Sequence, residues 1–263
     1  MSTPLPILYQ DDALVVIAKP SGLLVHRTAL ARGETRFALQ LLRDQLGRHV
    51  YPVHRLDRPT SGVLVFALSS EIARTLGEAF AEQRVSKRYL AVVRGHGPEA
   101  ECLDYALREE DGRRPKAEMP AMAATTEVRR LDSVELPVRV DRYPSARYSL
   151  MEARPLTGRR HQIRRHLSRR GYPIIGDARH GKGNHNRFFS ENLDTSRLLL
   201  AAVEMSLEHP VTGERLTVSA GLEDDMTQLF ARFGWNAHLP RHGHRFEKAE
   251  TEPSTTQAAI PTP

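Results

Sequence analysis

The chain has 263 residues and a formal net charge of +6, with hydrophobic residues making up 40% of it. This composition is typical of a globular protein, excludes a wholly disordered chain, and favours a polyanionic partner such as a nucleic acid. The one cysteine, Cys102, excludes an internal disulfide and a thiolate zinc cluster and fits a reducing compartment. Because no basic secretory leader and no apolar run of membrane-spanning length is found, we expect a cytoplasmic protein.

Hydrophobic periodicity and turn residues predict a chain that mixes strands with helices. In chain order, the pattern predicts a hairpin within 7–25, a helix over 37–46 ended by Gly47, a strand over 63–68, a helix capped by Ser69 or Ser70, a strand over 86–95, a loop over 109–126, a strand over 148–153, a helix over 161–170 ended by Gly171, and strands over 198–207 and 216–220. Because the strands and helices do not alternate regularly, we expect an α+β fold with a mixed sheet.

A lone carboxylate, Asp57, lies between Arg55 and Arg58 just before a predicted apolar strand. It can be a structural ion pair in a surface loop. It can equally be an active-site group that a neighbouring guanidinium keeps ionised where water is excluded. Tyr89, in the strand predicted over 86–95, is on its own an ordinary half-buried strand residue. Neither residue alone identifies a catalytic site.

The segment 154–171 carries seven arginines and no acidic residue. On a helix, Ile163 and Leu167 would face the core, and guanidinium groups would be presented on both sides of this stripe. Since arginine binds phosphate with two-point geometry, the segment indicates contact with RNA or DNA. A solvated basic helix without a partner is the alternative interpretation.

The sequence contains none of the common cofactor motifs. The histidines between 161 and 185 lack the spacing of a zinc site, and no glycine-rich nucleotide loop follows a strand. We therefore expect no metal ion and no nucleotide cofactor. A metal-dependent nuclease would need clustered carboxylates, which the sequence does not display.

Several stretches together resemble a known family, the RluA-type pseudouridine synthases. The stretches are, in order, KPSGLLVH at 19–26, HRLDRPTSG at 54–62, KRYLAVVRG at 87–95, GRRHQIRRHLSRRGYPIIGD at 158–177 and RLLLAAVEMSLEHPVTGE at 197–214. The resemblance covers about residues 7–235. It implies the fold of that family, in which a mixed, mainly antiparallel central sheet is flanked by helices and a catalytic cleft crosses the sheet.

The resemblance also implies an activity and roles for individual residues. The family isomerises uridine in RNA to its C-glycoside without a metal or nucleotide cofactor. Asp57 would be the essential carboxylate, Tyr89 would stack on the target base and assist proton removal, and Arg164 would pair with Asp57. Arg55 would help to hold the strand that the uridine has left. The residues expected to contact RNA are Arg55, Arg58, Lys87, Arg160, His161 and Arg165.

Within the family, the chain is most similar to the branch that acts on uridine 65 of tRNA. The similarity lies in its length, in RYPSARYSL at 142–150 and in FGW at 233–235. We therefore expect tRNA as the partner, with rRNA, or a non-catalytic RNA-binding protein on the same scaffold, as alternatives. Whether Asp57 attacks the sugar, attacks the ring or removes a sugar proton stays open. We further expect a monomer with one catalytic domain over 1–246 and a disordered tail over 247–263.

Overall fold

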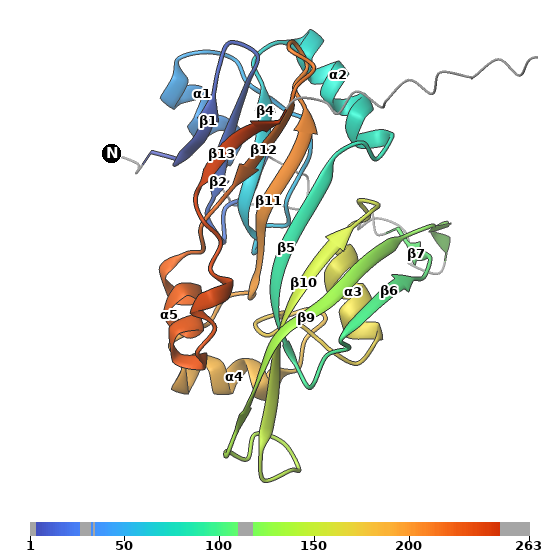
Figure 1. The fold of residues 1–263 in the computed structure, drawn as a ribbon, viewed down its shortest axis with the longest axis vertical. Helices are drawn as coiled ribbons and strands as arrows, with labels where there is room; N and C mark the ends of the chain where they lie inside the picture. Colours follow the sequence, from blue (N-terminus) through green and yellow to red (C-terminus); the bar gives the residue numbers. More distant parts are fainter. Residues whose placement is uncertain (1–3, 27–32, 34, 110–117, 248–263) are drawn as a thin grey trace, which may run out of the picture.

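The computed structural model describes residues 4–26, 33, 35–109 and 118–247 (Figure 1). One eleven-stranded sheet has the strand order β1-β2-β4-β11-β5-β10-β9-β6, with β3, β12 and β13 attached to its sides. The elements are β1 (Ile7–Gln10), β2 (Leu14–Lys19), α1 (Ala38–Leu46), β3 (Tyr51–Pro52), β4 (Ser61–Ala67), α2 (Ser70–Ala81), β5 (Ser86–Arg94), β6 (Ala100–Asp104), β7 (Leu107–Arg108), β8 (Ala121–Met122), β9 (Thr125–Leu136), β10 (Ala146–Pro155), α3 (Gln162–Arg169), α4 (Gly183–Asn192), β11 (Leu200–Glu208), β12 (Arg215–Ser219), α5 (Asp224–Phe233), the 3-10 helix η2 (Asn236–His238) and β13 (Gly243–Glu247). All pairs in this sheet are antiparallel except β4 with β11, which confirms the predicted α+β fold class.

The predicted hairpin, the helix over 37–46 and the helix after Ser69 are confirmed as β1–β2, α1 and α2. Their ends follow local chemistry. Gly47 ends α1 in the left-handed conformation with φ of 65°, where glycine carries no Cβ penalty. Ser69 begins α2, because its side chain accepts a hydrogen bond from the Ile72 backbone nitrogen at 3.2 Å.

The loop predicted over 109–126 is wrong at its C-terminal end. There, β8 forms at Ala121–Met122 and β9 begins at Thr125. Residues 110–117 of that segment lie outside the described residues, as does most of the predicted tail, 248–263. The single catalytic domain over 1–246 stays a prediction.

The sheet opens where β5 parts from β10. Strand β10 pairs with β5 from Arg94 only as far as Tyr89, whereas β11 pairs with β5 along 86–91. Beyond that point β10 continues beside β9 alone, through Arg154 and Pro155. The first three residues of β5 therefore have a hydrogen-bonded neighbour on the β11 side only, and the two strands diverge in Figure 1.

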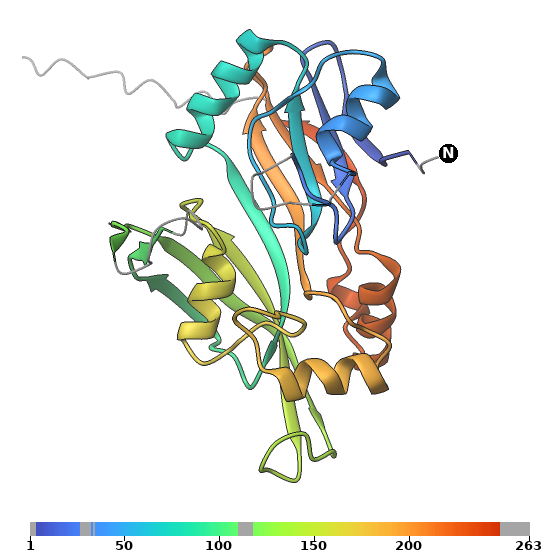
Figure 2. The same ribbon diagram turned by 180° about the vertical axis from the view of Figure 1, so that it is seen from behind.

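Helices α1, α2 and α3 lie on the same face of the sheet, which Figure 2 turns toward the viewer. Buried residues of the strands, of α1, α3, α4 and α5, and of the segments between α3 and β11 form one large hydrophobic cluster, and a smaller cluster lies beneath α2. Within the described ranges, no helix has the length and apolar character needed to cross a membrane. The large cluster includes residues of both β5 and β10, so both strands are packed into the core on either side of the point where they separate.

Strands β4 and β11 approach each other closely at Gly62. This glycine has φ of +111°, and a Cβ at its position would overlap the backbone of Ala202. Because Gly62 has no side chain, the parallel pairing of Ser61 and Gly62 with Ala201 and Ala202 can form. The loop that carries Asp57 therefore enters the sheet at a fixed point.

Candidate active site

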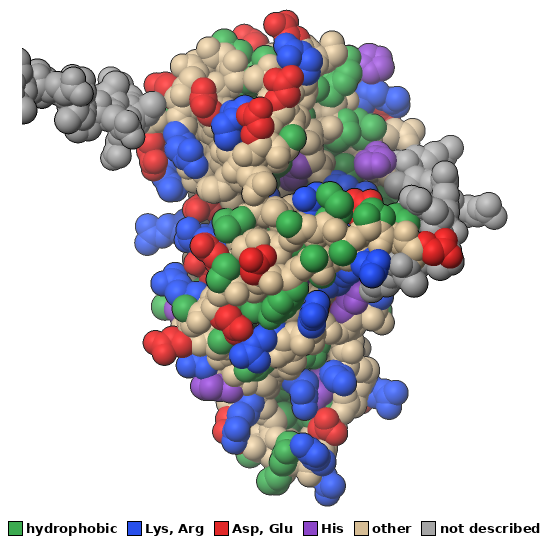
Figure 3. Space-filling view, turned by 90° about the vertical axis from the view of Figure 1, so that its right-hand side faces the viewer, with side chains coloured by type: hydrophobic (Ala, Val, Ile, Leu, Met, Phe, Trp, Pro, Cys, Tyr) green, Lys and Arg blue, Asp and Glu red, His purple; other side chains and the backbone are tan. Residues whose placement is uncertain are grey.

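A cleft of about 480 Å³ lies where β5 separates from β10. Its walls come from the loop before β4, from the start of β5 and from the segment that leads from β10 into α3. Asp57, Tyr89 and Arg164, the three predicted catalytic residues, all line it. Figure 3 shows this side of the molecule, with basic and histidine side chains gathered near the hollow between its upper and lower parts.

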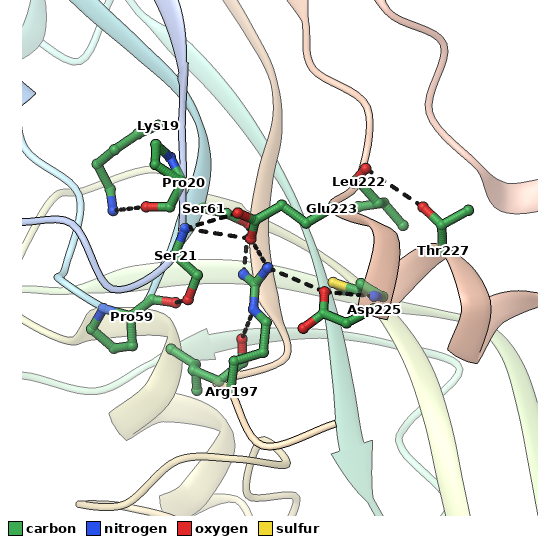
Figure 4. Close-up of polar contacts among 12 residues, drawn as sticks. Lys19, Pro20, Ser21, Pro59, Ser61, Arg197, Leu222, Glu223, Asp225 and Thr227 are labelled. Atoms are coloured by element: carbon green, nitrogen blue, oxygen red, sulfur yellow. Dashed lines mark hydrogen bonds and ion pairs between the residues drawn. The ribbon is translucent and has the colours of Figure 1, made fainter. Parts of the chain in front are cut away.

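The Asp57 loop is tied to the turn that follows β2. The Thr60 backbone nitrogen donates to the Asp57 carbonyl at 3.0 Å, which closes a tight turn around the carboxylate. From the other segment, the Ser21 hydroxyl donates to the carbonyl of Pro59 at 2.8 Å (Figure 4). Lys19 Nζ donates to the carbonyl of Arg58 at 3.2 Å. The backbone on either side of Asp57 is thus anchored.

A second set of contacts holds the same turn from behind (Figure 4). Arg197, just before β11, forms an ion pair with Glu223 and donates from Nη2 to the Ser61 hydroxyl at 2.6 Å. Glu223 in turn accepts from the Ser21 backbone nitrogen at 3.1 Å. Sequence reasoning missed this cluster, because its members are far apart in the chain and each is an ordinary charged or polar residue.

Lys19 is a buried lysine at the base of the loop, with 1% of its surface exposed. Its Nζ also donates to the carbonyls of Pro20 and Leu23, each at 2.8 Å. Burial, reinforced by the charge of Arg197 and opposed by that of Asp57, lowers the pKa of Lys19 to about 7. Its hydrogen bonds all go to backbone carbonyls, so its visible role is to shape the turn.

Asp57 and Arg164 are in direct contact. Arg164 Nη1 donates to Asp57 Oδ2 at 3.0 Å, although the two residues are 107 positions apart in the chain. The side chains are 16% and 6% exposed, so the pair lies at the floor of the cleft with Asp57 accessible. His161 Nε2 lies 3.9 Å from the same carboxylate oxygen. The structure therefore assembles the predicted carboxylate–guanidinium pair.

Helix α3 is not the basic surface helix that the sequence predicted. Ile163 and Leu167 do pack into the core, as expected, but Arg164 and Arg165 are buried as well. The expectation that guanidinium groups flank the apolar stripe in solvent is wrong for these two. The reason is that Arg164 has acidic partners outside the arginine-rich segment, namely Asp57 and Asp177.

Tyr89 lies at the point where β10 leaves β5, and only 8% of it is exposed. Burial, reinforced by the negative charge of Asp57, raises the pKa of Tyr89, so the hydroxyl stays protonated at neutral pH. Its place in the cleft wall is compatible with stacking on a base. To act as a general base, Tyr89 would first have to give up its hydroxyl proton, because only the phenolate can accept a proton from the substrate.

The predicted RNA contacts divide into two groups. Arg55, Lys87, Arg160 and His161 line the cleft. Arg58 and Arg165 are not part of the cleft wall: Arg58 is exposed beside the loop and donates to the Gly22 carbonyl at 3.0 Å, and Arg165 is only 9% exposed. The prediction for Arg165 treated it as a surface residue of α3, which the packing of that helix rules out.

His161 is held by a second histidine that sequence reasoning did not use. Its Nδ1 lies 3.0 Å from Nε2 of His180, and its backbone adopts a left-handed conformation with φ of 54°. Burial lowers the pKa of His161, so the ring is neutral near pH 7. An uncommon backbone conformation in a non-glycine residue beside a carboxylate is a frequent feature of functional sites.

We expect stability to depend on pH through His54, which lines the cleft. Its Nε2 accepts a hydrogen bond from the Val65 backbone at 3.0 Å and its ring stacks on Phe80, so the folded state needs the neutral ring. Burial, with the charge of Lys87, lowers the pKa of His54 to about 3. The unfolded chain binds this proton below about pH 6.5, so the contribution of His54 is lost as the pH falls toward 3.

Urea unfolding midpoints at about pH 7 and about pH 4.5 measure this effect. The His54→Gln protein should lose less stability on acidification than the wild type, because it lacks the titrating ring. His49→Gln, at an exposed position, is the matched control and should keep the wild-type slope. Parallel slopes for His54→Gln and the wild type would contradict the prediction.

Comparison with known proteins assigns the chain to a class of RNA-modifying enzymes. A family model described as RNA pseudouridylate synthase matches residues 13–169, so the chain belongs to this family. The resemblance to RluA-type pseudouridine synthases is thereby confirmed. The matched segment contains Asp57, Tyr89 and Arg164 and ends before Asp177.

Relatives of known name cover nearly the whole chain. A protein of Vibrio parahaemolyticus serotype O3:K6 (strain RIMD 2210633) named tRNA pseudouridine synthase C is 48% identical over 239 residues, which are 89% of this chain and 97% of that protein. A protein of Yersinia pestis with the same name is 45% identical over 247 residues, covering 92% and 96%. The solved structure of Human RNA Pseudouridylate Synthase Domain Containing 4 superposes with a TM-score of 0.65 at 27% identity, covering 87% of this chain and 93% of that one.

Proposed function

We propose that this protein converts a uridine of tRNA, at position 65, into pseudouridine in the cytoplasm. The observation that carries the proposal is the meeting of Asp57, Tyr89 and Arg164 in one cleft of a chain that belongs to the RNA pseudouridylate synthase family. The tRNA substrate is supported by the names of relatives at 45–48% identity over about nine-tenths of the chain. Position 65 is supported by the similarity of residues 142–150 and 233–235 to the branch of the family that acts on uridine 65 of tRNA.

The reaction breaks the bond between N1 of uracil and C1′ of the ribose and forms a bond from C5 to C1′. The C5 proton is released and N1 gains a proton, so no oxidant or co-substrate is consumed. A stacked uridine must first leave its neighbours, at a cost of a few kcal/mol. Stacking of the flipped uracil on Tyr89, which lies where β5 and β10 separate, would offset about 1–3 kcal/mol of this cost.

The groups around the cleft fit a flipped nucleoside. Asp57 supplies the reacting carboxylate, and Arg164 donates a charge-assisted hydrogen bond that orients it. Arg55 is exposed at the cleft and is suited to fill the space that the uridine leaves in the RNA. Lys87 and Arg160 line the same cleft and are suited to the phosphates on either side of it.

The purified protein, incubated with unmodified tRNA transcripts, tests the proposal by pseudouridine-specific chemical mapping. We expect one new pseudouridine, at position 65, and none in a transcript with cytidine at that position. An rRNA fragment set serves as the parallel substrate. Modification of rRNA alone would overturn the tRNA assignment. RNA binding without any modified uridine would favour a non-catalytic RNA-binding protein.

A further inference from the structure

Arg164 has two carboxylate partners, and they hold it unequally. Its Nε donates to Asp177 Oδ2 at 2.7 Å and its Nη2 donates to Asp177 Oδ1 at 2.8 Å. Only Nη1 is directed at Asp57, with a single contact of 3.0 Å to Oδ2. The guanidinium is planar and rigid, so a two-point grip on one edge fixes the direction of the remaining nitrogen.

Asp177 itself is fixed by its own turn. Its Oδ1 accepts hydrogen bonds from the backbone nitrogens of Arg179 at 2.9 Å and His180 at 3.0 Å. Its side chain is fully buried, with 0% exposed, and it is not part of the cleft wall. Burial alone would raise the pKa of Asp177, but the hydrogen bonds from Arg164 and the backbone outweigh it and the pKa is lowered. An RNA substrate therefore cannot reach this carboxylate, which stays charged.

The same turn also supports the histidine beside Asp57. His180, three residues after Asp177, contacts His161, and His161 lies 3.9 Å from Asp57 Oδ2. Both groups that approach the Asp57 carboxylate from this side are thus held by residues 177–180. Among the described residues, both approaches are to Oδ2, and no hydrogen bond to Oδ1 of Asp57 is found.

We propose that Asp177 is a positioning residue: it occupies two nitrogens of Arg164 so that Asp57 receives one contact and keeps its second oxygen for the nucleoside. Without the two hydrogen bonds to Asp177, the guanidinium of Arg164 could rotate and form a two-point ion pair with Asp57. Such a pair would use both oxygens of the reacting carboxylate. This inference rests on the proposed function, in which Asp57 is the reacting group.

The test uses Asp177→Asn in the full chain, with whichever RNA the wild-type protein modifies. Asparagine keeps the shape and its Oδ1 can still accept from the backbone, but its amide nitrogen cannot accept from Arg164. We expect the single-turnover rate to fall about 10- to 100-fold while the dissociation constant for RNA stays near the wild-type value. A rate equal to that of the wild type would overturn the proposal.

A double-mutant cycle with Arg164→Lys separates positioning from a general structural effect. Lysine cannot form a two-point contact with Asp177. In the Arg164→Lys background, Asp177→Asn should therefore reduce the single-turnover rate little further. Losses that multiply in the double variant would overturn the proposal. If the wild type modifies no RNA, the proposed function fails first, which distinguishes the two failures.

Asp11→Asn is the matched control for loss of a structural carboxylate. Asp11 also accepts from two backbone nitrogens, of Ala13 and Leu14 at 2.8 Å each, and pairs with His209 in the turn after β11. The Asp11→Asn substitution should lower the melting temperature and leave the single-turnover rate of pseudouridine formation unchanged. Should Asp177→Asn not fold, Asp177→Glu keeps the charge and displaces the carboxylate by one methylene. A wild-type rate in that variant overturns the proposal equally.

Discussion

Asp57→Asn is expected to abolish pseudouridine formation, with a rate loss of roughly 10⁴-fold or more, while RNA binding and folding are retained. Asparagine has nearly the same volume and its oxygen can still accept from Arg164. Arg164 also keeps a negatively charged partner, because its two hydrogen bonds to Asp177 are not affected by the substitution. The change therefore removes the reacting negative charge without leaving an unpaired buried cation.

Single-turnover assays and filter binding on the same RNA measure the two quantities. Asp44→Asn is the matched control: this carboxylate is exposed on α1, pairs with Arg43 and is not part of the cleft wall. It should behave as the wild type does. Wild-type-like turnover by Asp57→Asn would remove the basis of the proposed mechanism.

Arg164→Met is expected to damage both stability and catalysis. The substitution leaves Asp57 and the wholly buried Asp177 without their common counter-charge. Removing one partner of a buried ion pair costs about 3–5 kcal/mol, because the remaining charge stays desolvated and unpaired. We also expect activity to fall even under conditions where the protein is folded, since Asp57 loses the hydrogen bond that orients its carboxylate.

Urea unfolding measures the first effect and single-turnover kinetics the second. Arg170→Met, just after the same helix, is the control: its ion pair with Glu101 is exposed and screened by water, so its loss should change stability little. If Arg164→Met unfolds at the same urea concentration as Arg170→Met, the interpretation of Arg164 as the buried centre of the site is wrong.

Much of the secondary structure was predictable, because local signals decide it. Glycine at 47 and serine at 69 fix helix ends through their own backbone or side chain, and the apolar run of β4 needs no distant partner to be recognised. Helix α5 has local signals of the same kind, since Asp224 and Asp225 lie in its first turn and the apolar residues Met226 and Phe230 are four positions apart. Strand β9 carries a mainly polar sequence, because most of its side chains are not buried.

The site was predictable in part only. The resemblance, rather than any spacing, paired Asp57 with Arg164. The second carboxylate on Arg164 was not predicted, because Asp177 follows the arginine-rich segment and its approach depends on how α3 packs. The same packing explains why Arg165 is buried and not on the surface of α3: a buried helix face need not be apolar when hydrogen-bond partners compensate the charge.

Strand β11 lies between β4 and β5 in the sheet, although it comes more than a hundred residues after β5 along the chain. A growing polypeptide that has delivered all of Asp57, Tyr89 and Arg164 from the ribosome still lacks the strand that holds the first two in register. We therefore expect the nascent enzyme to stay unable to capture RNA productively until residue 208 has been synthesised and released from the exit tunnel.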